Sequence, residues 1–292
     1  MTRLPRWTLL LYLMASAASP PAQAAQRYAA RGMVVSVDRA GHTFTASIEA
    51  IPGYMQAMTM PFAVRQTKDL DGLATGAIVE FTLIVDSRDS HAERIRVVRF
   101  QNVEPDPFTA NRLTLLREIV SGAGAVNSLA PGETVPDFRL TDQQRHPVAL
   151  SDLRGKVVVV NFIYTSCVLP NFCLRLANHF GALQQRFKPQ LGRDLVLLTV
   201  TFDPVHDTPE VLAKYAEQWH ADAASWHFLT GPDPEIQRTC RLFGVHAFPD
   251  EGLMDHSLHT VLIDRQGTLV ANIEGNQFTA AQLGDLTERV LR

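Results

Sequence analysis

Residues 27–100 alternate between apolar and polar positions in short runs. Met33, Val35 and Val37 form one such run, and another begins at Phe44. A period of two places successive side chains on opposite faces of a strand. The runs are separated by turns that contain Gly41, Gly53, Gly72 and Gly76. Short strands with glycine-containing turns predict a small all-β domain, a barrel or a sandwich, which we place at residues 25–103.

Residues 104–130 interrupt the strand pattern. Pro105 and Pro107 are unfavourable within strands, whereas Arg112–Val120 has apolar residues at helical spacing. Glycine, alanine and serine dominate the stretch that follows. We therefore predict a flexible linker that contains one short helix.

Residues 131–292 alternate between apolar runs and helical segments. One helix is expected at Pro209–Trp219, where Thr208 can cap the first turn. Near-continuous apolar runs occur at Val157–Tyr164, Leu195–Phe202 and Thr260–Asp264. Parallel strands that are buried on both faces have this appearance. The pattern predicts an α/β domain with a mostly parallel central sheet.

The first 24 residues have the pattern of a secretory signal peptide. Arg3 and Arg6 precede a short apolar stretch, Trp7–Ala18, and an A-x-A cleavage pattern ends at Ala24. A membrane anchor is the less favoured alternative, because the apolar stretch is short for a bilayer. We expect an exported protein of the periplasm or cell envelope.

Charge and cysteine content exclude several classes of function. Without the signal segment, 25 basic and 30 acidic residues remain, a net charge of −5, with no run of lysine or arginine. Nucleic acid is therefore not expected as a partner. The chain has only three cysteines, too few for a disulfide framework in an exported protein of this size.

Cys167 and Cys173 lie six positions apart, directly after an apolar strand. Ligands of α/β sheets bind beyond the carboxyl ends of strands. We expect a helix to begin near Cys173, with its dipole lowering the thiol pKa values. Thiolates act both in disulfide exchange and as soft copper ligands, so a redox pair, a metal site and a structural disulfide stay open. Cys240 is expected to be a buried helix residue.

Three segments carry a family resemblance, in the order GETVPDFRLTDQQRHPVALSDLRGKVVVVNFIYTSC, TFDPVHDTPEVLAKY and DHSLHTVLIDRQG. Together they resemble the SCO/SenC family of copper proteins, which have a thioredoxin-like fold. The resemblance covers about Pro131–Arg292 and implies one copper ion held by Cys167, Cys173 and His256. It also implies a copper-receiving partner, a cytochrome oxidase subunit with a dinuclear copper centre, and a thiol reductant.

The chain departs from the family pattern at the second cysteine. The family pair is usually C-x-x-x-C-P, whereas five residues separate the cysteines here and Leu174 follows the second. Six positions still allow both sulfurs to meet one metal. His259 is three positions from His256 and should face the other way, and Met254 is expected to have a packing role.

Two enzyme functions compete with metal binding. Thioredoxin-like dithiol reductants resemble one another in a cis-proline beside the active pair, and no proline occurs from Asp250 to Asp264. This absence favours metal binding over a thiol–disulfide oxidoreductase. A peroxidase is disfavoured because the P-x-x-x-T/S-x-x-C frame is missing before Cys167.

Met55, Met58 and Met60 form a dense cluster in IPGYMQAMTMPF. Met58 and Met60 would share a strand face, and three thioethers make a soft site that selects Cu(I). A hydrophobic core strand is the alternative. The segment resembles the periplasmic copper-binding CusF-like family over about residues 28–100. At the positions of that family's histidine and tryptophan, this chain has Ser47 and Met55.

These two soft-metal signatures predict an exported copper metallochaperone that binds copper as Cu(I), Cu(II) or both. We hypothesise that the barrel passes Cu(I) across the linker to the Cys/Cys/His site, since a tether makes the step intramolecular.

Overall fold

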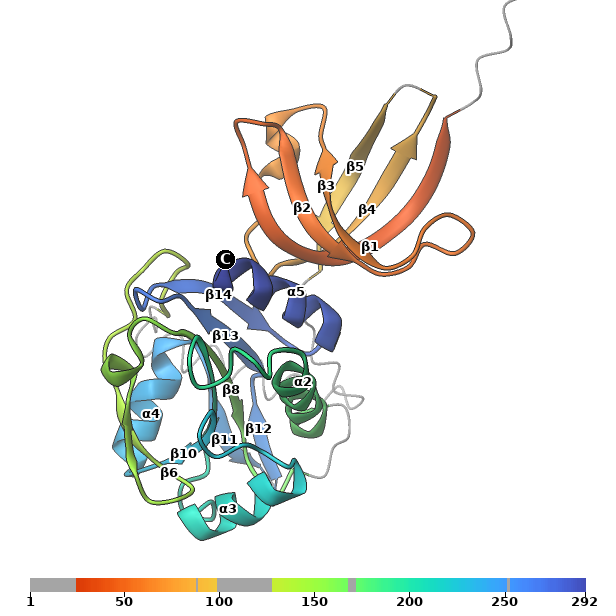
Figure 1. Ribbon diagram of the computed structural model, residues 1–292. Helices are drawn as coiled ribbons and strands as arrows, with labels where there is room; N and C mark the ends of the chain where they lie inside the picture. Colours follow the sequence, from red (N-terminus) through yellow and green to blue (C-terminus); the bar gives the residue numbers. More distant parts are fainter. Residues whose placement is uncertain (1–24, 88, 99–127, 168–171, 251–252) are drawn as a thin grey trace, which may run out of the picture.

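A computed structural model describes residues 25–87, 89–98, 128–167, 172–250 and 253–292 (Figure 1). The predicted signal segment and most of the predicted linker, with its helix, lie outside these residues. Among the helices of the described ranges, none has both the length and the apolar character needed to cross a membrane.

Five antiparallel strands form the amino-terminal barrel, in the order β3-β2-β1-β4-β5. The elements are β1 Gln26–Asp38, β2 Thr43–Ile48, β3 Met58–Ala63, the short 3₁₀ helix η1 Thr67–Leu70, β4 Ile78–Val85 and β5 Ser90–Val97. Val64, just after β3, bridges Ala92 of β5, which brings the two outer strands together. The rings of Phe44, Phe62 and Phe81 fill the interior, with centroids 4.9 to 5.5 Å apart. The predicted all-β domain is confirmed and is a barrel.

Seven strands form the sheet of the carboxyl-terminal part, in the order β14-β13-β8-β9-β10-β6-β7. They are β6 Arg139–Asp142, β7 Pro147–Ala149, β8 Val157–Ile163, β9 Leu195–Thr201, β10 Trp226–Thr230, β13 His259–Ile263 and β14 Leu269–Glu274. The helices are η2 Leu150–Leu153, α2 Cys173–Arg186, α3 Pro209–Gln218, α4 Asp233–Leu242 and α5 Ala280–Leu291. A separate hairpin pairs β11 Ala247–Asp250 with β12 Leu253–His256. Figure 1 shows α2 and α4 on opposite faces of the sheet.

The sheet is mixed, and the predicted mostly parallel arrangement was wrong. Strands β8, β9 and β10 are parallel, but β13, the apolar run near Thr260, is antiparallel to β8. The outer strands β14, β6 and β7 also pair antiparallel. A continuous apolar run reports burial on both faces and carries no information about strand direction.

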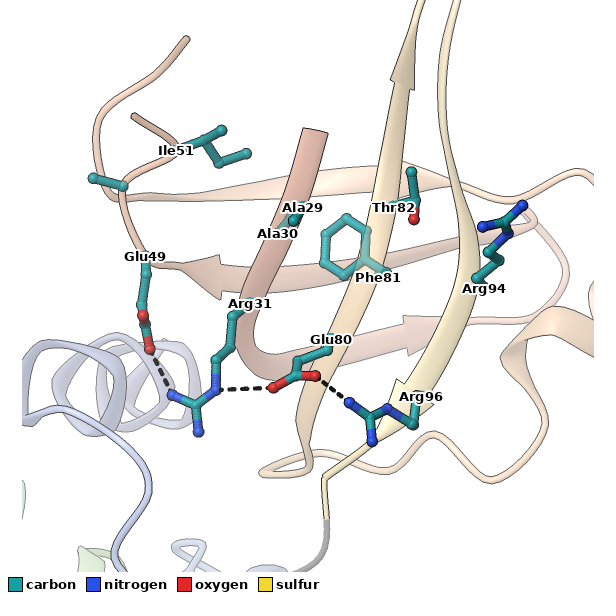
Figure 2. Close-up of a pocket in the computed structure, with 11 residues that line it drawn as sticks. Ala29, Ala30, Arg31, Glu49, Ile51, Glu80, Phe81, Thr82, Arg94 and Arg96 are labelled. Atoms are coloured by element: carbon teal, nitrogen blue, oxygen red, sulfur yellow. Dashed lines mark hydrogen bonds and ion pairs between the residues drawn. The ribbon is translucent and has the colours of Figure 1, made fainter. Parts of the chain in front are cut away.

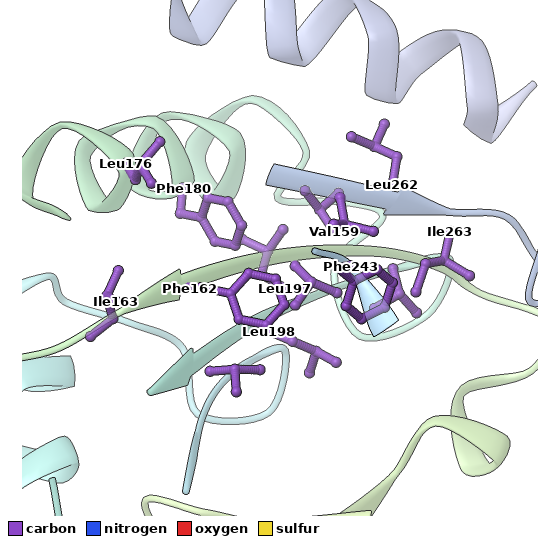
Figure 3. Packing of buried hydrophobic residues seen from close by; sticks show 14 of the residues in the cluster. Val159, Phe162, Ile163, Leu176, Phe180, Leu197, Leu198, Phe243, Leu262 and Ile263 are labelled. Carbon is purple, nitrogen blue, oxygen red and sulfur yellow. The ribbon is translucent and has the colours of Figure 1, made fainter. Parts of the chain in front are cut away.

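Packing of α2 on the central strands fixes the start of that helix. Every residue of β8 and β9 is buried. Leu176 and Phe180 of α2 pack in this core (Figure 3), and the Phe180 ring lies 5.9 Å from that of Trp226 in β10. The position of Cys173, the first residue of α2, therefore depends on this core. At the next helix, Thr208 accepts a hydrogen bond from the Val211 amide and caps α3, as predicted.

The barrel is seated on α5 and β14. Met33, Val35 and Ile78 of the barrel belong to the same buried apolar cluster as Ile273 of β14. Gly76 lies so close to β14 that a Cβ atom there would meet the Ile273 side chain at 3.0 Å. The two parts of the chain therefore share a hydrophobic interface.

We predict that Phe180→Ala destabilises the α/β part by about 3–5 kcal/mol, because the cavity removes buried contacts. Urea unfolding followed by circular dichroism measures this change. Gln185→Ala, at an exposed position of the same helix, is the control and should stay within about 0.5 kcal/mol. Equal effects of the two substitutions would contradict the packing described for α2.

A second prediction concerns His179, whose buried ring lies 5.0 Å from that of Phe278. Burial, with a smaller contribution from Arg175, lowers its pKa from 6.5 to about 4. Because the unfolded chain binds this proton more readily, stability should fall as the pH falls from about 6.5 towards about 4. The full shift corresponds to about 3 kcal/mol. Urea unfolding at pH 7 and pH 4.5 should show a weaker pH dependence for His179→Leu, and an unchanged dependence would refute this assignment.

Candidate metal centre

Three soft ligands meet beyond the carboxyl end of β8. Cys167 follows β8 in a turn, Cys173 begins α2, and His256 ends β12. Their sulfur and ring nitrogen atoms all lie within 4.8 Å of one another. The three residues are 5%, 0% and 6% exposed, respectively. The structure thus brings together the three residues that the sequence singled out, from segments far apart in the chain.

Neither of these two cysteines forms a disulfide in this structure. A hydrogen bond with Cys167, together with burial, raises the pKa of Cys173 well above its usual value. The expectation that the helix end lowers this pKa was therefore wrong for Cys173, because desolvation and the neighbouring sulfur outweigh the dipole. A metal cation that replaces the thiol protons would supply the missing stabilisation of the thiolates.

The His256 ring is oriented by its backbone and by aromatic neighbours. Its Nδ1 donates to the carbonyl oxygen of Ser257 at 3.2 Å, so that Nε2 is the nitrogen that would bind a metal. The ring centroid lies 4.7 Å from that of Phe202, 5.6 Å from Tyr164 and 6.3 Å from Phe172. A second hydrogen bond of this kind is how metal-binding histidines are usually held.

His259 and Cys240 lie outside this group of ligands, each buried at another place in the fold. Nδ1 of His259 is 2.8 Å from the Asn272 side-chain oxygen, and burial lowers the pKa of this histidine. Cys240 is buried in α4, as predicted, and burial raises its pKa to about 12. Neither residue belongs to the group of converging ligands. The side chain of Met254 lies outside the described part of the structure, so its expected packing role stays a prediction.

The methionine cluster lies along the rim of the barrel core. Met58 pairs with Ile48 and Met60 with Ala46, so both methionines share one face of β3, as predicted. Met58 is 45% exposed, while Met60 and Met55 pack partly against the core. One thioether is therefore open to solvent and two are partly sheltered.

Ser47 lies on the opposite face of the barrel sheet. It pairs with Thr59, and its hydroxyl donates to Asp285 of α5 at 2.6 Å. Ser47 is thus occupied by a contact between the two parts of the chain, and the methionine face has no histidine from β2.

Comparison with known proteins decides the family. The SCO1/SenC model matches residues 127–291, more than half of the chain. This chain belongs to the SCO1/SenC family. A second model, described as copper binding periplasmic protein CusF, matches residues 27–97 of the barrel.

Individual SCO proteins resemble the carboxyl-terminal part. A SCO2-like protein of Rickettsia typhi is 30% identical over 158 residues, 51% of this chain and 74% of that protein. The SCO1 protein homolog of Bacillus subtilis is 31% identical over 97 residues, 33% of this chain and 49% of that protein. The crystal structure of a SCO1/SenC family lipoprotein from Bacillus anthracis has a TM-score of 0.50 and 25% identity, covering 56% of this chain and 99% of its own. The predicted thioredoxin-like fold is confirmed.

Asp207 holds the turn before Cys167 at the candidate metal centre, and the sequence pattern does not identify it. It is 1% exposed and accepts hydrogen bonds from the Thr165 amide at 3.1 Å and from the hydroxyls of Thr165 and Thr201. Burial raises its pKa, although these hydrogen bonds act in the opposite direction. Because Thr165 lies two residues before Cys167, Asp207 anchors the turn that presents this cysteine. In the sequence, the neighbouring Thr208 and Pro209 indicate only the start of a helix.

We predict that Asp207→Ala loosens this turn and raises the reactivity of the cysteines towards a thiol reagent by about 10-fold or more, because orphaned buried donors cost about 1–3 kcal/mol. Reaction with a disulfide dye in the native protein measures the rate. His206→Ala, which removes an exposed side chain of the same loop, should leave the rate near that of the wild type. A rate unaffected by Asp207→Ala would show that the turn is held elsewhere.

Proposed function

We propose that this protein is an exported copper metallochaperone that binds one copper ion through Cys167, Cys173 and His256. The convergence of three buried soft ligands within 4.8 Å carries the proposal. Two thiolates select soft Cu(I), and imidazole suits Cu(II) as well as Cu(I). The hydrogen bond from Nδ1 of His256 to the Ser257 carbonyl oxygen, which assigns Nε2 to the metal, supports the role of His256 as the third ligand.

Burial favours metal binding over disulfide exchange. Exchange requires a thiolate, whereas a hydrogen bond with Cys167 and burial raise the pKa of Cys173 well above its usual value. The site therefore suits a held cation better than repeated reaction with protein disulfides.

A second copper site is proposed at Met55, Met58 and Met60. Support comes from the shared strand face of Met58 and Met60, from the exposed thioether of Met58, and from the CusF match over residues 27–97. Thioether sulfur is a soft ligand that favours Cu(I). Ser47 faces away, so methionine supplies the proposed ligand set.

The recipient and the location follow from the family resemblance. We propose a cytochrome oxidase subunit as the copper acceptor and the periplasm as the place of transfer. The signal-like segment of residues 1–24 supports export.

Anaerobic titration of the reduced protein with Cu(I) tests both sites. The wild type should bind two copper ions and a Met55/Met58/Met60→Leu variant one, because leucine keeps the volume and removes sulfur. His256→Ala in that variant should weaken the remaining site by more than about 100-fold, since it removes a direct ligand. His259→Ala is the matched control and should keep tight binding.

A reduced wild type that binds no copper and rapidly reduces protein disulfides would contradict the proposal and favour a thiol–disulfide oxidoreductase.

A further inference from the structure

A single carboxylate joins the barrel to the helix that carries Cys173. Asp285 of α5 accepts hydrogen bonds from Ser47 Oγ at 2.6 Å and Thr59 Oγ1 at 2.7 Å. The guanidinium of Arg186, the last residue of α2, donates to the same carboxylate at 2.7 Å. Burial alone would raise the pKa of Asp285, but these hydrogen bonds hold it below its usual value. Asp285 is therefore a charged junction between β2, β3 and α2.

Further contacts hold the barrel against α5 and β14, at the interface that we call the seat. Gln282 of α5 donates to the carbonyl oxygen of Ser47 at 3.2 Å. Arg31 of β1 donates to the carbonyl oxygen of Gln277 at 3.2 Å. Figure 2 shows Arg31 between Glu49 and Glu80, beside a groove of about 450 Å³. The interface thus combines hydrogen bonds with the apolar contacts around Ile273, while the ion pairs of Arg31 lie within the barrel.

This seat separates the two proposed copper sites. Thr59, between Met58 and Met60, is held at the Arg186 end of α2, whereas Cys173 begins that helix. A helix of 14 residues is about 20 Å long. In addition, α5 lies between the barrel and α2 (Figure 1). Copper moves between sulfur ligands by exchange, which requires both ligand sets within about 5 Å, twice a metal–sulfur bond.

Release of the barrel is unfavourable. It would expose Met33, Val35 and Ile78, which are 0%, 4% and 6% exposed. Exposing each such side chain costs about 1.5–3 kcal/mol, in addition to the charged hydrogen bonds of Asp285. By contrast, Met58 is already 45% exposed and open to another molecule.

On the basis of the proposed function, we infer that copper held by the methionines is passed to the Cys/Cys/His site of a second copy of this chain, because the seated barrel blocks transfer within one molecule. The copper stays Cu(I) throughout. Its bonds to thioether sulfur break, bonds to the two cysteine sulfurs form, and the thiol protons pass to solvent.

The kinetic order of transfer tests this inference. Less than one equivalent of Cu(I) is mixed rapidly with reduced wild type, and Cu(I)–thiolate absorption follows arrival at the cysteines. We expect a slow phase whose rate doubles when the protein concentration doubles. A rate independent of concentration would overturn the inference, as would the same phase in the Met55/Met58/Met60→Leu variant.

Asp285→Arg gives an independent test, because it sets a second cation against Arg186 and removes the acceptor of Ser47 and Thr59. Small-angle scattering should show a released barrel, and the slow phase should become independent of concentration. Glu288→Ala is the control, since Glu288 pairs with Arg186 and has no described hydrogen bond or ion pair to the barrel. If release leaves the phase dependent on concentration, the seat does not block transfer. Equilibrium copper stoichiometry, which the seat does not affect, decides the proposed function separately.

Discussion

The joint burial of two thiols and one imidazole is the constraint on which the site depends. A hydrogen bond with Cys167 and burial both raise the pKa of Cys173, so the thiolate is disfavoured in the structure as it stands. A bound soft cation would reverse this preference by stabilising the thiolates and would use the imidazole of His256 as a third ligand. The surrounding fold positions each of these groups. The core beneath α2 positions Cys173, the aromatic rings position His256, and the hydrogen bonds of Asp207 hold the turn before Cys167.

The helix α2 connects this site to the rest of the chain. Its first residue is Cys173, and its last, Arg186, reaches the carboxylate that also holds β2 and β3 of the barrel. The packing that positions the cysteine therefore also positions the seat of the barrel. As a result, two regions with soft ligands are fixed at a distance within one molecule rather than joined only by a tether.

Local patterns in the sequence were sufficient for most strands and helices, whereas the candidate ligand set with His256 came from the family resemblance. The apolar run before Cys167, the cap at Thr208 and the alternation around Met58 each depend on neighbours in the chain, and each predicted feature is present. Features that depend on distant contacts could not be derived in this way. The direction of β13, the anchoring of Thr165 by Asp207, and the seating of the barrel all depend on residues far apart in the chain.

X-ray absorption spectroscopy of copper bound to the Met55/Met58/Met60→Leu variant tests the central claim most directly, because it reports the ligand atoms themselves. The account predicts a first coordination sphere with two sulfur atoms and one imidazole nitrogen, from Cys167, Cys173 and His256. A spectrum without the imidazole nitrogen, or with only one sulfur, would contradict it.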